Sequence, residues 1–121
     1  MINSGIYQLL IELPEAETIA VGSLGEIFFA EGLYIYTGSA EKNLRERIAR
    51  HFRKEKAFHW HIDYLLKYGE ITAYSLQPYE PGLECSTNLD SLSSYRDAKS
   101  ISGFGSSDCD CDSHLIFIGP G

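Results

Sequence analysis

The order of strand-like and helix-like segments constrains the fold of this chain more than any other feature. Short segments rich in Ile, Leu, Tyr and Phe occur at both ends and in the middle, with a few helical segments between them. The two types do not alternate regularly, as they would in a parallel sheet built from βαβ units. The sequence therefore predicts an α+β fold with a small, mainly antiparallel central sheet flanked by helices, formed by one domain over residues 1–121.

Turn residues and hydrophobic periodicity set the expected element boundaries. We expect strands over 4–13, 18–22, 27–29, 33–37, 71–77 and 114–118, and helices over 41–54, 59–68 and 82–94. Ser39 is positioned to cap the first helix. In that helix Leu44, Ile48 and Phe52 recur at helical spacing, which predicts a buried stripe.

Positive charge is concentrated in one part of an otherwise acidic chain. The net charge is −7, yet seven of the ten Lys and Arg residues lie between positions 42 and 56. That segment carries +5 and the remainder carries −12. Such a patch can bind phosphates, although a solvated helix face would have the same composition. The candidate nucleic-acid contacts are Gly38, Ser39, Arg45, Arg50, Arg53, Lys54 and Lys56.

The cysteine and hydropathy patterns favour a reducing environment without a membrane. Three cysteines are an odd number, and Cys109 and Cys111 are too close in sequence for an unstrained mutual disulfide. No apolar run approaches the roughly 18 residues that span a bilayer. The first residues also lack the charged and apolar regions of a signal peptide. We therefore expect a cytoplasmic protein with no membrane partner.

Four short motifs give the chain a resemblance to a known family. Gly5-Ile6-Tyr7 lies in the first strand, Tyr36-Thr37-Gly38 lies in a later one, LRERIARH fills 44–51, and Glu84 lies early in the third helix. In this order they resemble the motifs of the GIY-YIG endonucleases, over 5–92. The whole chain is similar to a compact GIY-YIG-like group of no established activity, some of whose members are fused to an endonuclease III domain.

The resemblance implies both a site and a reaction, the hydrolysis of DNA phosphodiester bonds. Tyr7 or Tyr36 would orient or deprotonate the attacking water, and His51 would hydrogen-bond a tyrosine or the nucleophile. Arg47 would hold the scissile phosphate, and Glu84 would bind one Mg²⁺ or Mn²⁺ ion. Without the resemblance, half-buried strand residues are the favoured interpretation of Tyr7 and Tyr36.

A histidine and aspartate cluster opens the second expected helix. His59 and Asp63 lie four residues apart on one helical face and can share a hydrogen bond. Together with His61 they could instead position a metal or a phosphate. We favour helix packing or an N-cap contact over a ligand site.

A second cluster could hold zinc. Cys109, Cys111 and His114, with or without Cys85, have the donor types of a tetrahedral zinc site. The Cys-x-Cys spacing is shorter than in most zinc sites, however, and the chain has no second cysteine pair. The sequence therefore disfavours zinc and favours packed, reduced thiols.

The leading functional hypothesis is a metal-dependent nuclease that recognises structured or damaged DNA, with RNA as an open alternative. One rival is a non-catalytic nucleic-acid-binding module on the same fold. The other is a domain that binds a small molecule or a protein. Because a short nuclease domain normally borrows affinity from another domain, we also expect a partner protein, for example one of DNA repair.

Overall fold

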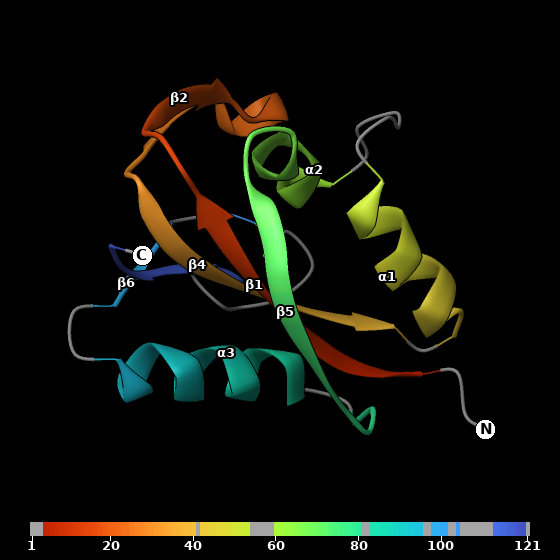
Figure 1. Ribbon diagram of the computed structural model, residues 1–121. Coiled ribbons are helices and arrows are strands. Elements are labelled where there is room, and N and C mark those ends of the chain that lie inside the picture. Colours follow the sequence, from red (N-terminus) through yellow and green to blue (C-terminus); the bar gives the residue numbers. More distant parts are fainter. Residues whose placement is uncertain are drawn as a thin grey trace.

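Five antiparallel strands form the central sheet of the protein, which confirms the predicted α+β class. The computed structural model describes residues 4–40, 42–53, 60–80, 83–95, 98–101, 104 and 113–120, and only the backbone of 83–85 and 89. The sheet has the strand order β5-β1-β4-β7-β6, and β2 and β3 form a separate two-stranded sheet. Figure 1 shows α1 and α2 together on one side of the strands and α3 on the other.

Most of the expected elements are present with shifted ends. The strands are β1 (Gly5–Leu13), β2 (Glu17–Ala20), β3 (Glu26–Phe29), β4 (Gly32–Ala40), β5 (Glu70–Gln77), β6 (Lys99–Ser100) and β7 (Leu115–Gly119). The helices are α1 (Leu44–Phe52), α2 (His61–Leu66) and α3 (Leu83–Ser94), with a short 3-10 helix, η1, at Gly22–Leu24. The two-residue strand β6 is too short to produce a periodic signal, so the sequence did not predict it.

The alternation of side chains along β1 and β4 separates two sheet faces. Tyr7 and Leu9 of β1 and Tyr34 and Tyr36 of β4 join the main hydrophobic core with residues of α1 and α2. Gln8, between Tyr7 and Leu9, points to the other face, where it donates a hydrogen bond to Ser91 of α3. We call these the α1 face and the α3 face.

Two expectations about α1 were wrong. Ser39 does not cap the helix, because it remains in β4 and pairs with Ile6 of β1. The residue before the helix is Asn43, whose left-handed φ of 60° turns the chain between strand and helix. Phe52 was expected to complete the buried stripe of Leu44 and Ile48, but it is 48% exposed.

The exposure of Phe52 follows from the strand order. It contacts Tyr74 of β5, and β5 is an outer strand of the sheet, so none of the described strands lies beyond it on this side of the helix. In the described ranges, none of the helices has both the length and the apolar character needed to cross a bilayer.

Candidate functional site

A buried tyrosine–histidine pair lies at the centre of the α1 face. Tyr7 Oη lies 2.8 Å from His51 Nε2, and the hydrogen bond joins β1 to α1. Both residues are only 2% exposed. In the neutral tautomer protonated on Nδ1, the imidazole accepts this bond from the phenol at Nε2.

A glycine makes room for this pair. Tyr7 is directly opposite Gly38 in the β1–β4 ladder. A Cβ at position 38 would lie 2.5 Å from both the Cζ and the hydroxyl oxygen of Tyr7. The phenol therefore crosses the neighbouring strand over a position that only glycine leaves open.

Aromatic rings surround His51. The Tyr36 ring lies edge-on to the imidazole with centroids 6.1 Å apart, and the Tyr7 and Trp60 rings are tilted against it at 5.5 and 5.6 Å. The strands bearing Tyr7 and Tyr36 pair antiparallel, and both rings lie on the same face. These contacts fix the imidazole plane and exclude water from most of its surface.

Two arginines of α1 pack on the indole of Trp60. The guanidinium carbons of Arg47 and Arg50 lie 5.0 and 4.5 Å from the ring centroid, within cation–π range. Arg47 also donates a hydrogen bond of 2.5 Å to the carbonyl of Ser39. Through Trp60, the Arg47 side chain is thus connected to the aromatic surroundings of His51.

Arg50 and Asp63 form a bidentate ion pair between α1 and α2. The Arg50 Nη1 and Nη2 atoms donate to the two carboxylate oxygens at 2.9 and 3.0 Å. Asp63 is fully buried, and its Oδ2 also accepts the backbone N–H of Trp60 at 2.9 Å. The predicted N-cap contact of Asp63 is therefore present, and its predicted partner His59 lies outside the described residues.

Comparison with known families identifies the chain. A family model described as Domain of unknown function DUF123 matches residues 6–120. The chain belongs to this family. No curated protein and no solved structure matches it.

Membership in DUF123 corrects the assignment to the GIY-YIG endonucleases, which was wrong. DUF123 is a distinct family, and no GIY-YIG model matches the chain. Short motifs such as Gly-Ile-Tyr match by composition and order alone, whereas the DUF123 match extends over nearly the whole chain. The roles that the resemblance implied for Tyr7, Arg47 and Glu84 therefore rest only on the geometry of this DUF123 structure.

The DUF123 structure does not bring Glu84 to the same face as the other predicted catalytic residues. Glu84 belongs to α3, and α3 packs on the α3 face through bonds such as Gln8 to Ser91. Tyr7 and His51 lie on the α1 face. The helix that carries Glu84 and the Tyr7–His51 pair therefore lie on opposite faces of the sheet, although sequence order alone placed them together.

The remaining predicted residues are dispersed. Arg45 and Arg53 are exposed on α1 and at its end, and His61 is partly exposed with its ring against Phe104. Burial lowers the pKa of His61 from its ordinary value. His114 is buried at 3% exposure beside β7. The side chain of Cys85, and all of Lys54, Lys56, Cys109 and Cys111, lie outside the described residues.

The described side chains do not assemble a metal site. Within the described ranges, no group of three or more His, Cys, Asp or Glu residues is placed to share a metal ion. The buried carboxylate of Asp63 is engaged by Arg50 and by the Trp60 N–H. The side chain of Glu84, the predicted Mg²⁺ or Mn²⁺ ligand, lies outside the described residues.

Sequence reasoning missed Trp60, which contacts His51, Arg47 and Arg50. It is the only tryptophan in the chain. The sequence carried no clear signal for Trp60, because an indole only donates hydrogen bonds and cannot act as the N-cap acceptor of a capping box, although Asp63 has the spacing to accept the Trp60 N–H.

Proposed function

We propose that this protein hydrolyses phosphodiester bonds of DNA, with its chemistry centred on Tyr7 and His51. The observation that carries the proposal is the 2.8 Å hydrogen bond between the phenol and the imidazole. A hydroxyl within hydrogen-bond reach of a base that is itself held in place is the arrangement of an activated nucleophile or general base. Gly38 leaves room for the Tyr7 ring, which supports the view that the position of the phenol is specific.

In the proposed reaction, Tyr7 and His51 move a proton. An attacking water transfers its proton to the Tyr7 oxygen while the phenol proton passes to Nε2 of His51. Tyr36 and Trp60 hold the imidazole plane, and the dry surroundings strengthen the hydrogen bond. This proton transfer involves only the two side chains and the attacking water.

Arg47 is the proposed phosphate ligand. Its contact with the Ser39 carbonyl uses one of the five N–H donors of the guanidinium. The planar fork matches phosphate oxygens, and its charge stabilises the charge that develops in the transition state. The exposed cations Lys42, Arg45 and Arg53 would hold the flanking backbone. We place this activity in the cytoplasm, with a repair protein as the partner that supplies targeting.

Cleavage assays with matched variants test the proposal. Labelled flaps, bubbles, abasic duplexes and RNA of the same sequence are incubated with Mg²⁺, Mn²⁺ or chelator. Tyr7→Phe and His51→Gln should each lower the cleavage rate by about 100-fold or more. Tyr34→Phe is the control, because it removes another buried hydroxyl that does not bond to His51. The Tyr34 hydroxyl donates to the Ala30 carbonyl at 2.6 Å.

Arg47 is tested by separating binding from turnover. Arg47→Ala should lower the cleavage rate far more than the affinity, because its charge acts chiefly in the transition state. Arg53→Ala, an exposed cation at the end of α1, is the control and should change affinity alone. Equal cleavage by Tyr7→Phe and the wild type would contradict the proposal.

The burial of the pair favours a second candidate, a non-catalytic nucleic-acid-binding module. Tyr7 and His51 are each 2% exposed, so their hydrogen bond can equally serve to fasten α1 to the sheet. In this case the cations of α1 bind phosphates without turnover. The second candidate is favoured if pure wild-type protein binds these substrates in a salt-dependent manner and cleaves none of them.

A further inference from the structure

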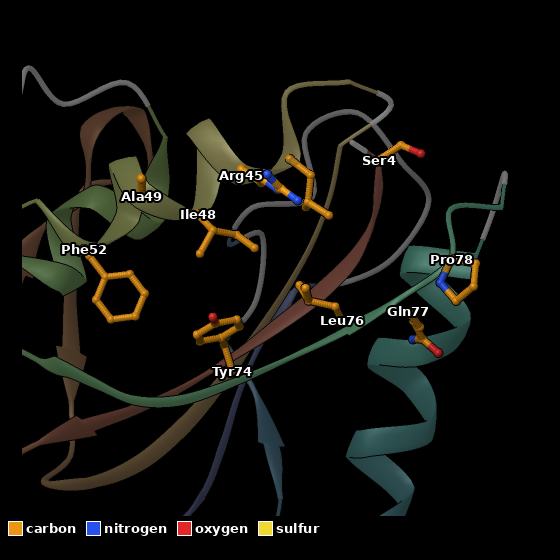
Figure 2. Close-up of a pocket in the computed structure, with 10 residues that line it drawn as sticks. Ser4, Arg45, Ile48, Ala49, Phe52, Tyr74, Leu76, Gln77 and Pro78 are labelled. Carbon is orange, nitrogen blue, oxygen red and sulfur yellow. The ribbon is translucent and has the colours of Figure 1, made fainter. Parts of the chain in front are cut away.

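An open groove lies between α1 and β5, on the outer side of the α1 face. Figure 2 shows Ile48 and Phe52 of the helix facing Tyr74 and Leu76 of the edge strand, with Arg45 beside them. The groove has a volume of about 600 Å³. Leu44 and Ile48 line it from the helix side and are buried, at 7% and 9% exposure.

The groove keeps large apolar side chains in contact with solvent. Phe52 is 48% exposed, and Tyr74 and Leu76 are each 53% exposed. The Phe52 and Tyr74 rings meet edge to face with centroids 6.0 Å apart. Each ring therefore keeps an exposed surface on which a flat apolar group can stack.

The groove adjoins the Tyr7 site through the sheet. Leu76 is the ladder partner of Tyr7, and Tyr74 is the partner of Leu9. Directly opposed residues project to the same sheet face, so the groove and the Tyr7–His51 pair lie on the α1 face, on the two sides of α1. A chain bound in the groove would therefore pass beside the helix that carries His51.

The charges around the groove complement a polyanion. Arg45 of α1 lines the groove, and Lys42 and Arg53 are exposed on the same segment, whereas Arg47 and Arg50 pack on Trp60. Residues 71–77 of β5 carry no charge. A cationic wall above a neutral, aromatic floor matches a ligand with phosphates along one side and flat rings along the other.

We propose that this groove binds an unpaired, single-stranded segment of nucleic acid, with its bases stacked on Tyr74 and Phe52. The inference rests on the proposed action on nucleic acid and specifies the substrate, a junction or flap with unpaired nucleotides. In a duplex the bases are stacked on one another, so only an unpaired strand offers them to these rings. Arg45 contacts the backbone of that strand.

A second copy of this chain is a weaker candidate for the groove. The edge of β5 could pair with its own copy, but a two-fold axis at this edge would bring the cationic helices α1 of both copies to one side. Like charges at that distance oppose association. Electrostatic interaction with the cations of α1 therefore favours binding of a polyanion and opposes binding of a second copy.

Anisotropy titrations in chelator test the groove, and gel electrophoresis of each sample verifies that the labelled strand is still intact. The ligands are one labelled oligonucleotide as DNA and as RNA, each single-stranded or annealed to its complement. Tyr74→Ala and Phe52→Ala should each weaken single-strand binding by about tenfold and leave duplex binding unchanged. Tyr74→Leu keeps a large apolar side chain but removes the aromatic ring, so it should weaken single-strand binding to a similar degree. Phe28→Ala, which removes a 64% exposed ring on β3, is the control and should change neither.

The outcomes separate this inference from the proposed catalysis. Groove-dependent binding of single strands without any cleavage supports the inference and contradicts catalysis. No single-strand binding, or binding that Tyr74→Leu and Phe52→Ala leave unchanged, overturns the inference whatever the cleavage assay gives. A wild-type dimer that Tyr74→Ala dissociates, with unchanged single-strand affinity, would also overturn it and assign the groove to self-association. Circular dichroism of each variant verifies the fold.

Discussion

The two faces of the sheet bury polar groups in opposite ways. On the α1 face the buried polar groups are ionic or titratable, namely the Tyr7–His51 pair and the Arg50–Asp63 ion pair. The hydrogen-bonded side chains that hold α3 on the other face are neutral. Gln8 bonds to Thr37 and Ser91, Gln77 bonds to Thr87, and Asn88 donates to the Ser113 carbonyl at 2.6 Å.

This difference indicates that the faces have different tasks. Neutral hydrogen bonds hold a helix on a sheet with a moderate contribution to stability, and their groups do not titrate near neutral pH. Charged and titratable groups are costly to bury, so their concentration under α1 marks the face where chemistry or binding is expected. We therefore expect substitutions on the α1 face to change function, and those on the α3 face to change stability alone.

The largest expected effect is at the buried ion pair. Asp63→Ala should lower the free energy of unfolding by about 4 kcal/mol, because it leaves the Arg50 guanidinium without its carboxylate and removes an acceptor for the Trp60 N–H. Urea denaturation measures the change. Glu26→Ala, at an exposed carboxylate, should stay within about 0.5 kcal/mol of the wild type. Similar losses at both positions would remove the distinction between buried and surface charge.

Gly38→Ala should be the next most destabilising change, by about 3 kcal/mol. The added Cβ overlaps the Tyr7 ring, so the phenol must leave its place over β4 and lose its bond to His51. The double variant Gly38→Ala with Tyr7→Leu relieves the overlap, so its loss should be smaller than the sum of the two single losses. Strict additivity would show that position 38 acts independently of the ring.

On the α3 face, Gln8→Ala should lower the free energy of unfolding by about 1.5 kcal/mol, because it removes two neutral hydrogen bonds, to Thr37 and to Ser91. The variant should bind nucleic acid with the wild-type affinity and salt dependence. A change in either binding property would mean that the α3 face takes part in recognition. Denaturation curves and anisotropy titrations on the same samples measure both effects.

The smallest neutral-pH effect is expected at Tyr34→Phe, about 1 kcal/mol, for the lost hydrogen bond to the Ala30 carbonyl. Burial raises the pKa of Tyr34 above its ordinary value of 10.0. The unfolded phenol therefore loses its proton first, and wild-type stability should fall with this group by about 1.4 kcal/mol per pH unit above pH 10. The variant lacks this contribution, so its deficit should vanish on going from pH 9 to 11. A constant deficit would contradict the shifted pKa.

Local sequence patterns are enough to predict which way many side chains of the α1 face point. Residue parity in 33–37 is enough to put Tyr34 and Tyr36 on the side opposite to Ile35, because side chains alternate along a strand. The spacing in 44–51 is likewise enough to put Arg47 and His51 one turn apart on α1.

The remainder depends on how distant elements meet, which periodicity does not encode. Phe52 continues an apolar stripe, but its exposure follows from the edge position of β5. Glu84 lies in a correctly predicted helix, but the helix packs on the other face. Asp63 binds Arg50, thirteen residues earlier, because α2 docks against α1.

The contact of Trp60 with two guanidinium groups makes its fluorescence a reporter of this site. It is the only indole in the chain, so tryptophan emission arises from this one place, beside the cations of α1 and the imidazole of His51. A phosphate that draws Arg47 away from the indole would change the intensity and wavelength of that emission. Ligand capture at this site can therefore be followed in unlabelled protein, in real time, even when nothing is cleaved.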